Sequence, residues 1–115
     1  MSLLVERLLP IGLLLGANVF MTFAWYGHLK FKFAPLFIVI LASWGIAFFE
    51  YVLQVPANRW GSAVYSAPQL KGMQEVITLV VFAVFSASYL GQALKWNHWA
   101  GFALIAVAAW LIFME

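Results

Sequence analysis

The chain has 115 residues, of which 66% are hydrophobic and 9% are charged, whereas about 25% of the residues in a soluble domain are charged. This composition excludes a soluble globular domain and indicates a polytopic membrane protein with room for one small bundle. The net charge of +2 comes without a basic run, so nucleic-acid binding is not expected. The absence of cysteine excludes disulfides and thiolate metal sites.

Four apolar segments are long enough to cross a bilayer, which requires about 20 mostly apolar residues. They predict an all-α membrane protein that forms a single domain over residues 1–115, with transmembrane helices at about 4–26, 33–54, 68–90 and 97–114. Ser66 and Gln69 have the spacing of a capping box at the start of the third helix. Pro56 disfavours helical geometry at Val55 and predicts that the second helix ends there.

Two of the four acidic residues, Glu50 and Glu75, lie a full turn or more inside the predicted helices, whereas Glu6 lies in the first turn of its helix. A carboxylate at that depth costs roughly 2.5 to 3.5 kcal/mol on insertion scales and usually faces a bundle interior, a partner charge or a substrate path. Gln54 follows Glu50 by four residues and therefore lies on the same helical face. The third helix carries a second polar face, formed by Lys71, Gln74, Glu75 and Thr78.

These two polar faces are expected to meet. If the second helix ends near Gln54, both Glu50 and Lys71 lie within roughly 8 Å of the same membrane boundary. Lys71 and Glu75 form an i,i+4 pair. Two interpretations follow. A Glu50–Lys71–Glu75 network is purely structural and holds the two helices together, or two carboxylates share one cation, which leaves one of them to take up a proton or a cationic substrate.

Two further polar or aromatic positions are candidates. Asn18 lies four residues before Thr22 in the first helix and is expected to form interhelical hydrogen bonds or to line the same cavity. Trp44 in the second helix either packs or stacks on a cation. No nucleophile constellation, phosphate-binding loop or metal-ligand spacing is present. We therefore expect no enzyme activity, no metal site and no cofactor.

The basic residues are divided evenly between the two predicted membrane sides. Arg7, Arg59 and Lys71 flank the side of the termini, and Lys30, Lys32 and Lys95 flank the other. Orientation is normally set by an excess of Lys and Arg on the cytoplasmic side. The even division predicts insertion in both orientations and an antiparallel homodimer. The alternative is one fixed orientation, decided by the charges closest to the spans.

Three stretches carry a resemblance to a known family, namely EYVLQVPANRWG at 50–61, QLKGMQEVITL at 69–79 and YLGQALKWN at 89–97. With four short helices, the chain resembles the uncharacterised four-helix family of the drug/metabolite transporter superfamily. The resemblance covers nearly the whole chain. It implies a relation to small multidrug resistance proteins, similar four-helix antiparallel dimers that export cations in exchange for protons. Their essential glutamate lies in the middle of the first helix, where this chain has Asn18 and Thr22, so that site is not carried over.

The combined interpretation is a small dimeric transporter, embedded by several helices in a bacterial inner membrane, with lipid and a small cationic or amphipathic metabolite as partners. Its expected substrate- or proton-binding residues are Glu50, Glu75, Lys71, Gln54, Gln74, Thr78, Asn18 and Trp44. The alternative function is a non-transporting accessory subunit, for example of a heteromeric lipid-linked metabolite flippase, in which the charges only specify packing. Neutralising the carboxylates separates the two, because it abolishes an activity in the first case and only changes stability in the second.

Overall fold

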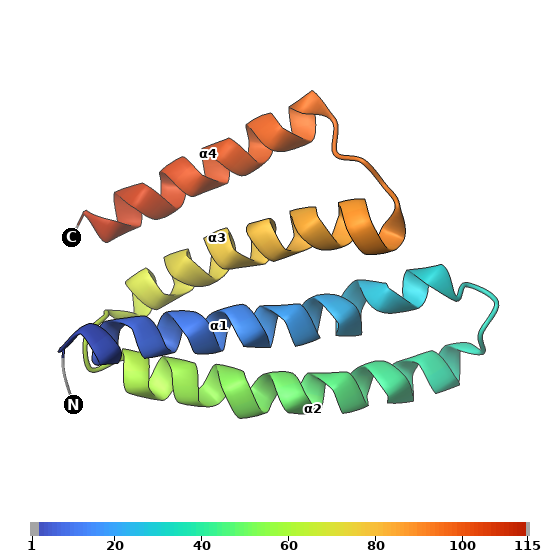
Figure 1. Cartoon of the computed structure of the whole chain (residues 1–115), viewed down its shortest axis with the longest axis horizontal. Coiled ribbons are helices and arrows are strands. Elements are labelled where there is room, and N and C mark those ends of the chain that lie inside the picture. The colour runs from blue at the N-terminus through green and yellow to red at the C-terminus, as the bar shows by residue number, and fades with distance from the viewer. Residues whose placement is uncertain (1–2, 115) are drawn as a thin grey trace.

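The computed structural model describes residues 3–114 and consists of helices joined by short connections (Figure 1). Four long helices, α1 (Leu3–Tyr26), α2 (Leu36–Gly61), α3 (Ala67–Phe85) and α4 (Trp96–Phe113), account for most of it. A 3₁₀ turn, η1 (Gly27–Lys30), extends α1, and a π-helical turn, η2 (Ser86–Leu90), extends α3. Each of the four is long and apolar enough to cross a membrane. The prediction of an all-α membrane protein with four transmembrane helices is confirmed.

The helices run up and down in a flattened bundle of 48 × 34 × 19 Å. Helix α1 lies between α2 and α3, and α4 lies on the outer side of α3 (Figure 1). Helices α2 and α3, which are consecutive in the chain, therefore contact each other only sparsely. Both chain ends lie at one end of the bundle, which we call the terminal end. The opposite end, with the connections after α1 and α3, is the loop end.

The interior is narrow and is built from close helix contacts. Leu14 and Pro10 on α1 are fully buried. A Cβ added to Gly61 at the end of α2 would lie 2.8 Å from Leu70 Cδ2 on α3 and 3.1 Å from Pro10 Cβ. Any larger residue at this position would therefore have to displace Leu70 or Pro10, where the three helices meet. Close approach at small residues is the usual way in which membrane helices associate, because lipid is as apolar as their side chains.

The end of α2 differs from the sequence prediction. The helix continues through Pro56 to Gly61, so the prediction that it ends at Gln54 is wrong. Proline at this position removes the backbone bond to the carbonyl of Val52. A helix that broke open in lipid would leave several more polar groups without partners, and the helix therefore persists. As a consequence, Glu50 lies about 16 Å from the end of α2 instead of roughly 8 Å.

The start of α3 agrees with the prediction. The Ser66 hydroxyl accepts a hydrogen bond from the Gln69 N–H at 3.2 Å, and Gln69 Oε1 accepts one from the Ser66 N–H at 3.0 Å. This capping box satisfies amide groups that have no partner within the helix. It fixes where α3 begins, and with it the depth of Lys71 and Gln74.

Candidate functional site

Glu50 on α2 is a buried carboxylic acid within a membrane-spanning helix. Its side chain is 4% exposed, and among residues 3–114 its Oε2 atom has no hydrogen-bond partner. The neighbouring Phe49 stacks on Phe20 of α1 at 6.0 Å. A Cβ on Gly16 of α1 would lie 3.1 Å from Leu53 Cδ1. These two contacts place Glu50 level with the middle of α1, and hence deep between the two membrane boundaries.

Asn18, also in the middle of α1, joins α1 to α3. Its side chain is 2% exposed, and its Nδ2 donates to the Leu14 carbonyl at 2.7 Å. Its Oδ1 accepts hydrogen bonds from Gln74 Nε2 at 3.0 Å and from Thr78 Oγ1 at 2.5 Å. The predicted interhelical hydrogen bonding of Asn18 is confirmed. The same bonds orient Gln74, because its amide nitrogen is engaged and its carbonyl oxygen remains available as an acceptor.

Two more acceptor oxygens resemble Glu50 Oε2 in their surroundings. Gln54 Oε1 on α2 and Gln74 Oε1 on α3 are buried and have no partner within the described residues. A buried polar atom without a partner costs about 1 to 3 kcal/mol. All three atoms are acceptors, so a ligand that supplies N–H groups or positive charge would satisfy them. An anion or a pure acceptor would not.

A cleft of about 530 Å³ lies between α2 and α3 at the terminal end. Its walls are formed by Gln54, Asn58, Ser62, Ala67, Leu70, Lys71 and Gln74. Gln54, Asn58 and Ser62 are four residues apart and follow one face of α2 from the interior to the helix end. Glu50 is one turn deeper on the same face, next to the inner end of the cleft wall at Gln54.

The predicted charge network is only partly present. Lys71 Nζ lies 2.7 Å from Glu75 Oε1, which confirms the i,i+4 pair, and the two side chains are 71% and 45% exposed. Glu50 takes part in no ion pair within residues 3–114, so the expected Glu50–Lys71–Glu75 network is wrong. The reason is depth. Lys71 lies about 6 Å from the start of α3, and Glu50 about 16 Å from the end of α2.

Trp44 lies apart from the buried polar residues, whereas two residues that were not predicted, Asn58 and Ser62, lie in the cleft wall. Trp44 is 73% exposed, so nothing within one copy of the chain covers it and it does not join the buried cluster. Asn58 and Ser62 were not among the predicted site residues, although both line the cleft. Their spacing from Gln54 is the signal that identifies them, and it was hidden because the second helix was predicted to stop before them.

Comparison with known proteins places the chain in a family. Residues 10–113 match the model of the family DMT_6, described as "Putative member of DMT superfamily (DUF486)". No curated protein and no solved structure matches the chain. Since the match extends over most of the sequence, the chain belongs to this family, and it is a multi-pass membrane protein of the transporter-like type.

Proposed function

We propose that this protein is a small transporter in which Glu50 binds a proton and a small cationic or amphipathic metabolite in turn. The observation that carries the proposal is the burial of the Glu50 carboxyl group near mid-membrane without an ion pair. Ionisable groups at such depth are neutral, paired or hydrated, and they usually mark a substrate or proton path. Here the partner is not another side chain, so an exchangeable proton or cation fulfils this role.

The surroundings of Glu50 favour a cation. Gln54 Oε1 and Gln74 Oε1 add two acceptors on the way from the cleft. The only basic side chain on the cleft wall, Lys71, is paired with Glu75, so its charge is compensated and does not repel an entering cation. The cleft thus combines acceptor groups with a neutral entrance.

Exchange at one carboxyl group couples the two ligands. When a cation enters, the protonated Glu50 releases its proton and becomes the carboxylate that holds the cation. When the proton returns, the cation leaves. Because Glu50 carries one negative charge at most, the two ligands exclude each other. An inward proton gradient across a bacterial inner membrane then drives cation export.

A second copy of the chain supplies what one copy lacks for transport. A flat four-helix bundle encloses little volume, whereas two copies in opposite orientation enclose a path between them. The resulting two-fold axis in the membrane plane provides the inverted repeat on which alternating access depends. We therefore include an antiparallel homodimer in the proposal.

Proton release on cation binding tests the proposal. The detergent-purified protein is first screened by thermal shift against inorganic and organic cations, because a ligand of the folded state raises the apparent stability. A stabilising cation is then added to weakly buffered protein with a pH-sensitive dye. We expect proton release by the parent and by Glu75→Gln, and none by Glu50→Gln.

Two results contradict the proposal. One is that no cation stabilises the parent protein at any pH between about 6 and 9, the range in which a group that exchanges protons near neutrality would titrate. The other is that Glu50→Gln binds cations and releases protons as the parent does. Either result favours the accessory-subunit alternative, in which the polar residues only specify packing.

A further inference from the structure

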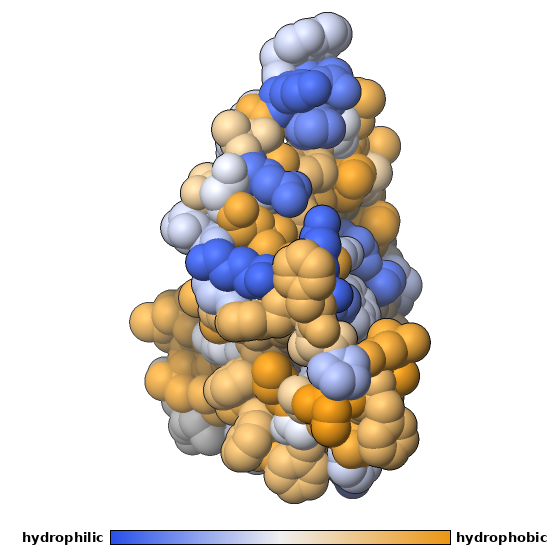
Figure 2. Space-filling view, turned by 90° about the vertical axis from the view of Figure 1, so that its right-hand side faces the viewer, coloured by the Kyte–Doolittle hydropathy of each residue, from blue (hydrophilic) through white to orange (hydrophobic). Residues whose placement is uncertain are grey.

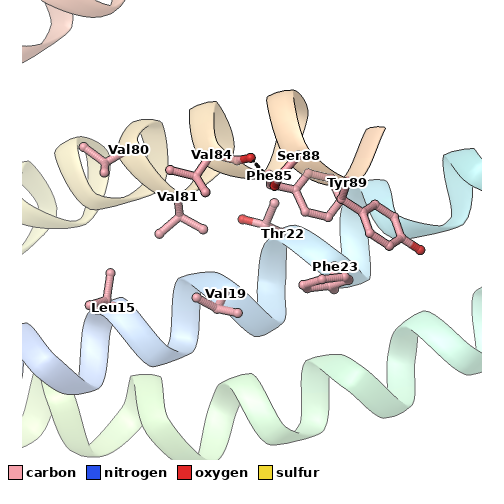
Figure 3. Close-up of a pocket in the computed structure, with 10 residues that line it drawn as sticks. All are labelled: Leu15, Val19, Thr22, Phe23, Val80, Val81, Val84, Phe85, Ser88 and Tyr89. Atoms are coloured by element: carbon pink, nitrogen blue, oxygen red, sulfur yellow. Dashed lines mark hydrogen bonds between the residues drawn. The ribbon is translucent and has the colours of Figure 1, made fainter. Parts of the chain in front are cut away.

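A second hollow lies between α1 and α3, away from the cleft (Figure 3). This groove has a volume of about 460 Å³, and most of its wall is apolar, including Val19 of α1 and Val81 and Val84 of α3. The hydroxyl of Ser88 in the wall donates to the Val84 carbonyl at 2.6 Å, so it requires no partner from a ligand. The groove therefore suits a hydrocarbon chain better than a polar molecule.

The length of the groove along the helices is close to the hydrocarbon thickness of one lipid leaflet. On α1 it extends from Leu15 to Phe23, about 12 Å, and on α3 from Val80 to Tyr89, about 13 Å. Half of a hydrocarbon core of about 30 Å is about 15 Å. The groove also runs along the helices and reaches Tyr89 near the loop end. Its direction and length thus correspond to one acyl chain of the leaflet on that side.

Lys30 places a positive charge without acidic neighbours in sequence at this end of the groove. Lys30 Nζ lies 4.3 Å from the ring centroid of Tyr89, the residue that closes the groove wall. The loop end also carries the exposed Lys32 and Lys95, and segments 27–35 and 86–98 contain no acidic residue. Figure 2 views this end and shows hydrophilic groups gathered among apolar ones. At the terminal end, by contrast, basic residues are accompanied by Glu6 and Glu75.

We propose that the α1–α3 groove binds an acyl chain of an anionic phospholipid whose phosphate lies at Lys30. The apolar wall contacts the acyl chain, and the lysines without acidic neighbours attract the anionic headgroup. The two alternative occupants, a zwitterionic lipid and a helix of a second copy, would fill the groove without requiring the positive charge of Lys30. Each lysine near an anionic headgroup contributes about a fivefold preference. The inference is independent of the proposed role of Glu50.

Native mass spectrometry with lipid competition tests the proposal. The protein is offered equal amounts of phosphatidylglycerol and phosphatidylcholine with identical acyl chains. We expect the parent to retain phosphatidylglycerol about fivefold or more over phosphatidylcholine. Lys30→Gln lowers this preference about fivefold, and Val84→Trp, which fills the groove, lowers the retention of both lipids. Arg59→Gln at the terminal end and Val107→Trp on the outer face of α4 are the matched controls and retain lipid as the parent does.

Several outcomes overturn the proposal. These are equal retention of both lipids by the parent, an unchanged preference in Lys30→Gln, or unchanged retention in Val84→Trp. If Val84→Trp alters the oligomeric state and leaves lipid retention unchanged, the groove belongs to a second copy. Glycerol 3-phosphate has the headgroup charge without the acyl chains. If it displaces the lipid, the site binds a free phosphate group rather than a lipid, and the proposal is wrong. Circular dichroism verifies folding, and Val19→Trp on the opposite wall replaces Val84→Trp if that variant does not fold.

Discussion

The two intramembrane carboxylates of this chain lie in opposite environments although both occur within apolar segments. Glu75 is half-exposed and paired with Lys71. Glu50 is buried, and within the described residues it has no ion pair. The sequence identifies both as costly residues, but it does not separate them, because exposure depends on which face each helix turns to its neighbours. The burial of Glu50 without an ion pair is the reason why the proposed transport function is assigned to this residue.

We predict that Glu50→Gln and Glu75→Gln leave the protein folded. Glutamine at position 50 keeps the shape and removes an ionisable group that no other side chain pairs with, so the thermal midpoint should stay the same or rise. At position 75 the substitution breaks an exposed i,i+4 pair, for which a loss of about 0.5 kcal/mol is expected. Thermal unfolding in detergent measures both. A loss of several kcal/mol in Glu50→Gln would show a buried ion pair that only supports the fold.

Asn18 shows how a single amide organises the bundle, since it holds two α3 side chains to α1. Asn18→Leu removes the acceptor for Gln74 and Thr78, and we predict a destabilisation of about 1 kcal/mol, because interhelical hydrogen bonds in membranes average about 0.6 kcal/mol each. Denaturant unfolding gives the value, and a double-mutant cycle with Thr78→Val isolates the shared part. Ser88→Ala is the control, because its bond joins η2 to the adjoining Val84 of α3 and does not link two helices of the bundle. Additive effects of Asn18→Leu and Thr78→Val would argue against coupling through this bond.

At the scale of single elements, the sequence predicts where helices begin better than where they end. The capping box at Ser66 is a local hydrogen-bond pattern, and it is present as predicted. The end of α2 was predicted from Pro56, whose effect is also local, yet the lipid environment favours the continued helix over a break. The extra turns of α2 change the depth of Glu50 and bring Asn58 and Ser62 into the cleft wall. The misplaced helix end thus accounts for the missed residues, and it contributes to the missing ion pair because it places Glu50 deeper than Lys71.

We predict that Pro56→Ala stabilises the protein, because it restores a backbone bond to Val52 in the interior of α2. A gain of about 1 kcal/mol corresponds to a rise of several degrees in the thermal midpoint of a chain of this size. Pro10→Ala in α1 is the matched comparison, since Pro10 is fully buried and contacts Gly61. There the restored bond is offset by lost packing, and the midpoint should not rise. A fall in the midpoint of Pro56→Ala would indicate that the proline is needed to shape the cleft.

For the whole molecule, the order of the helices is what the sequence does not contain. The similar depth of Glu50 and Lys71 suggested that the polar faces of the second and third helices meet directly, but α1 lies between α2 and α3. The polar faces of α2 and α3 therefore meet around α1, with Asn18 as the bridge to α3, rather than through a direct contact of charges. Helix periodicity grouped Gln74 with Thr78, and both side chains donate to Asn18. Which third helix separates the polar faces of α2 and α3 depends on packing between segments far apart in the chain.

The distribution of charge over the whole molecule also determines how it inserts. Three basic residues lie at each end of the bundle, Arg7, Arg59 and Lys71 at the terminal end and Lys30, Lys32 and Lys95 at the loop end. Acidic residues contribute little to orientation, so we expect the balance of Lys and Arg to leave neither end preferred. An antiparallel dimer needs both orientations in one membrane, and a single gene product supplies both only if this balance holds.

We predict that C-terminal fusions to a reporter active only inside the cell and to one active only outside both give signal. Gln92→Lys adds a positive charge to the exposed loop end and should move the C-terminus to the outside. Ala63→Lys adds the same charge to the exposed terminal end and should have the opposite effect. Because each variant is the control for the other, a general effect of lysine on expression is excluded. Strong signal from only one reporter, unmoved by either lysine, would establish a single orientation and rule out the antiparallel dimer.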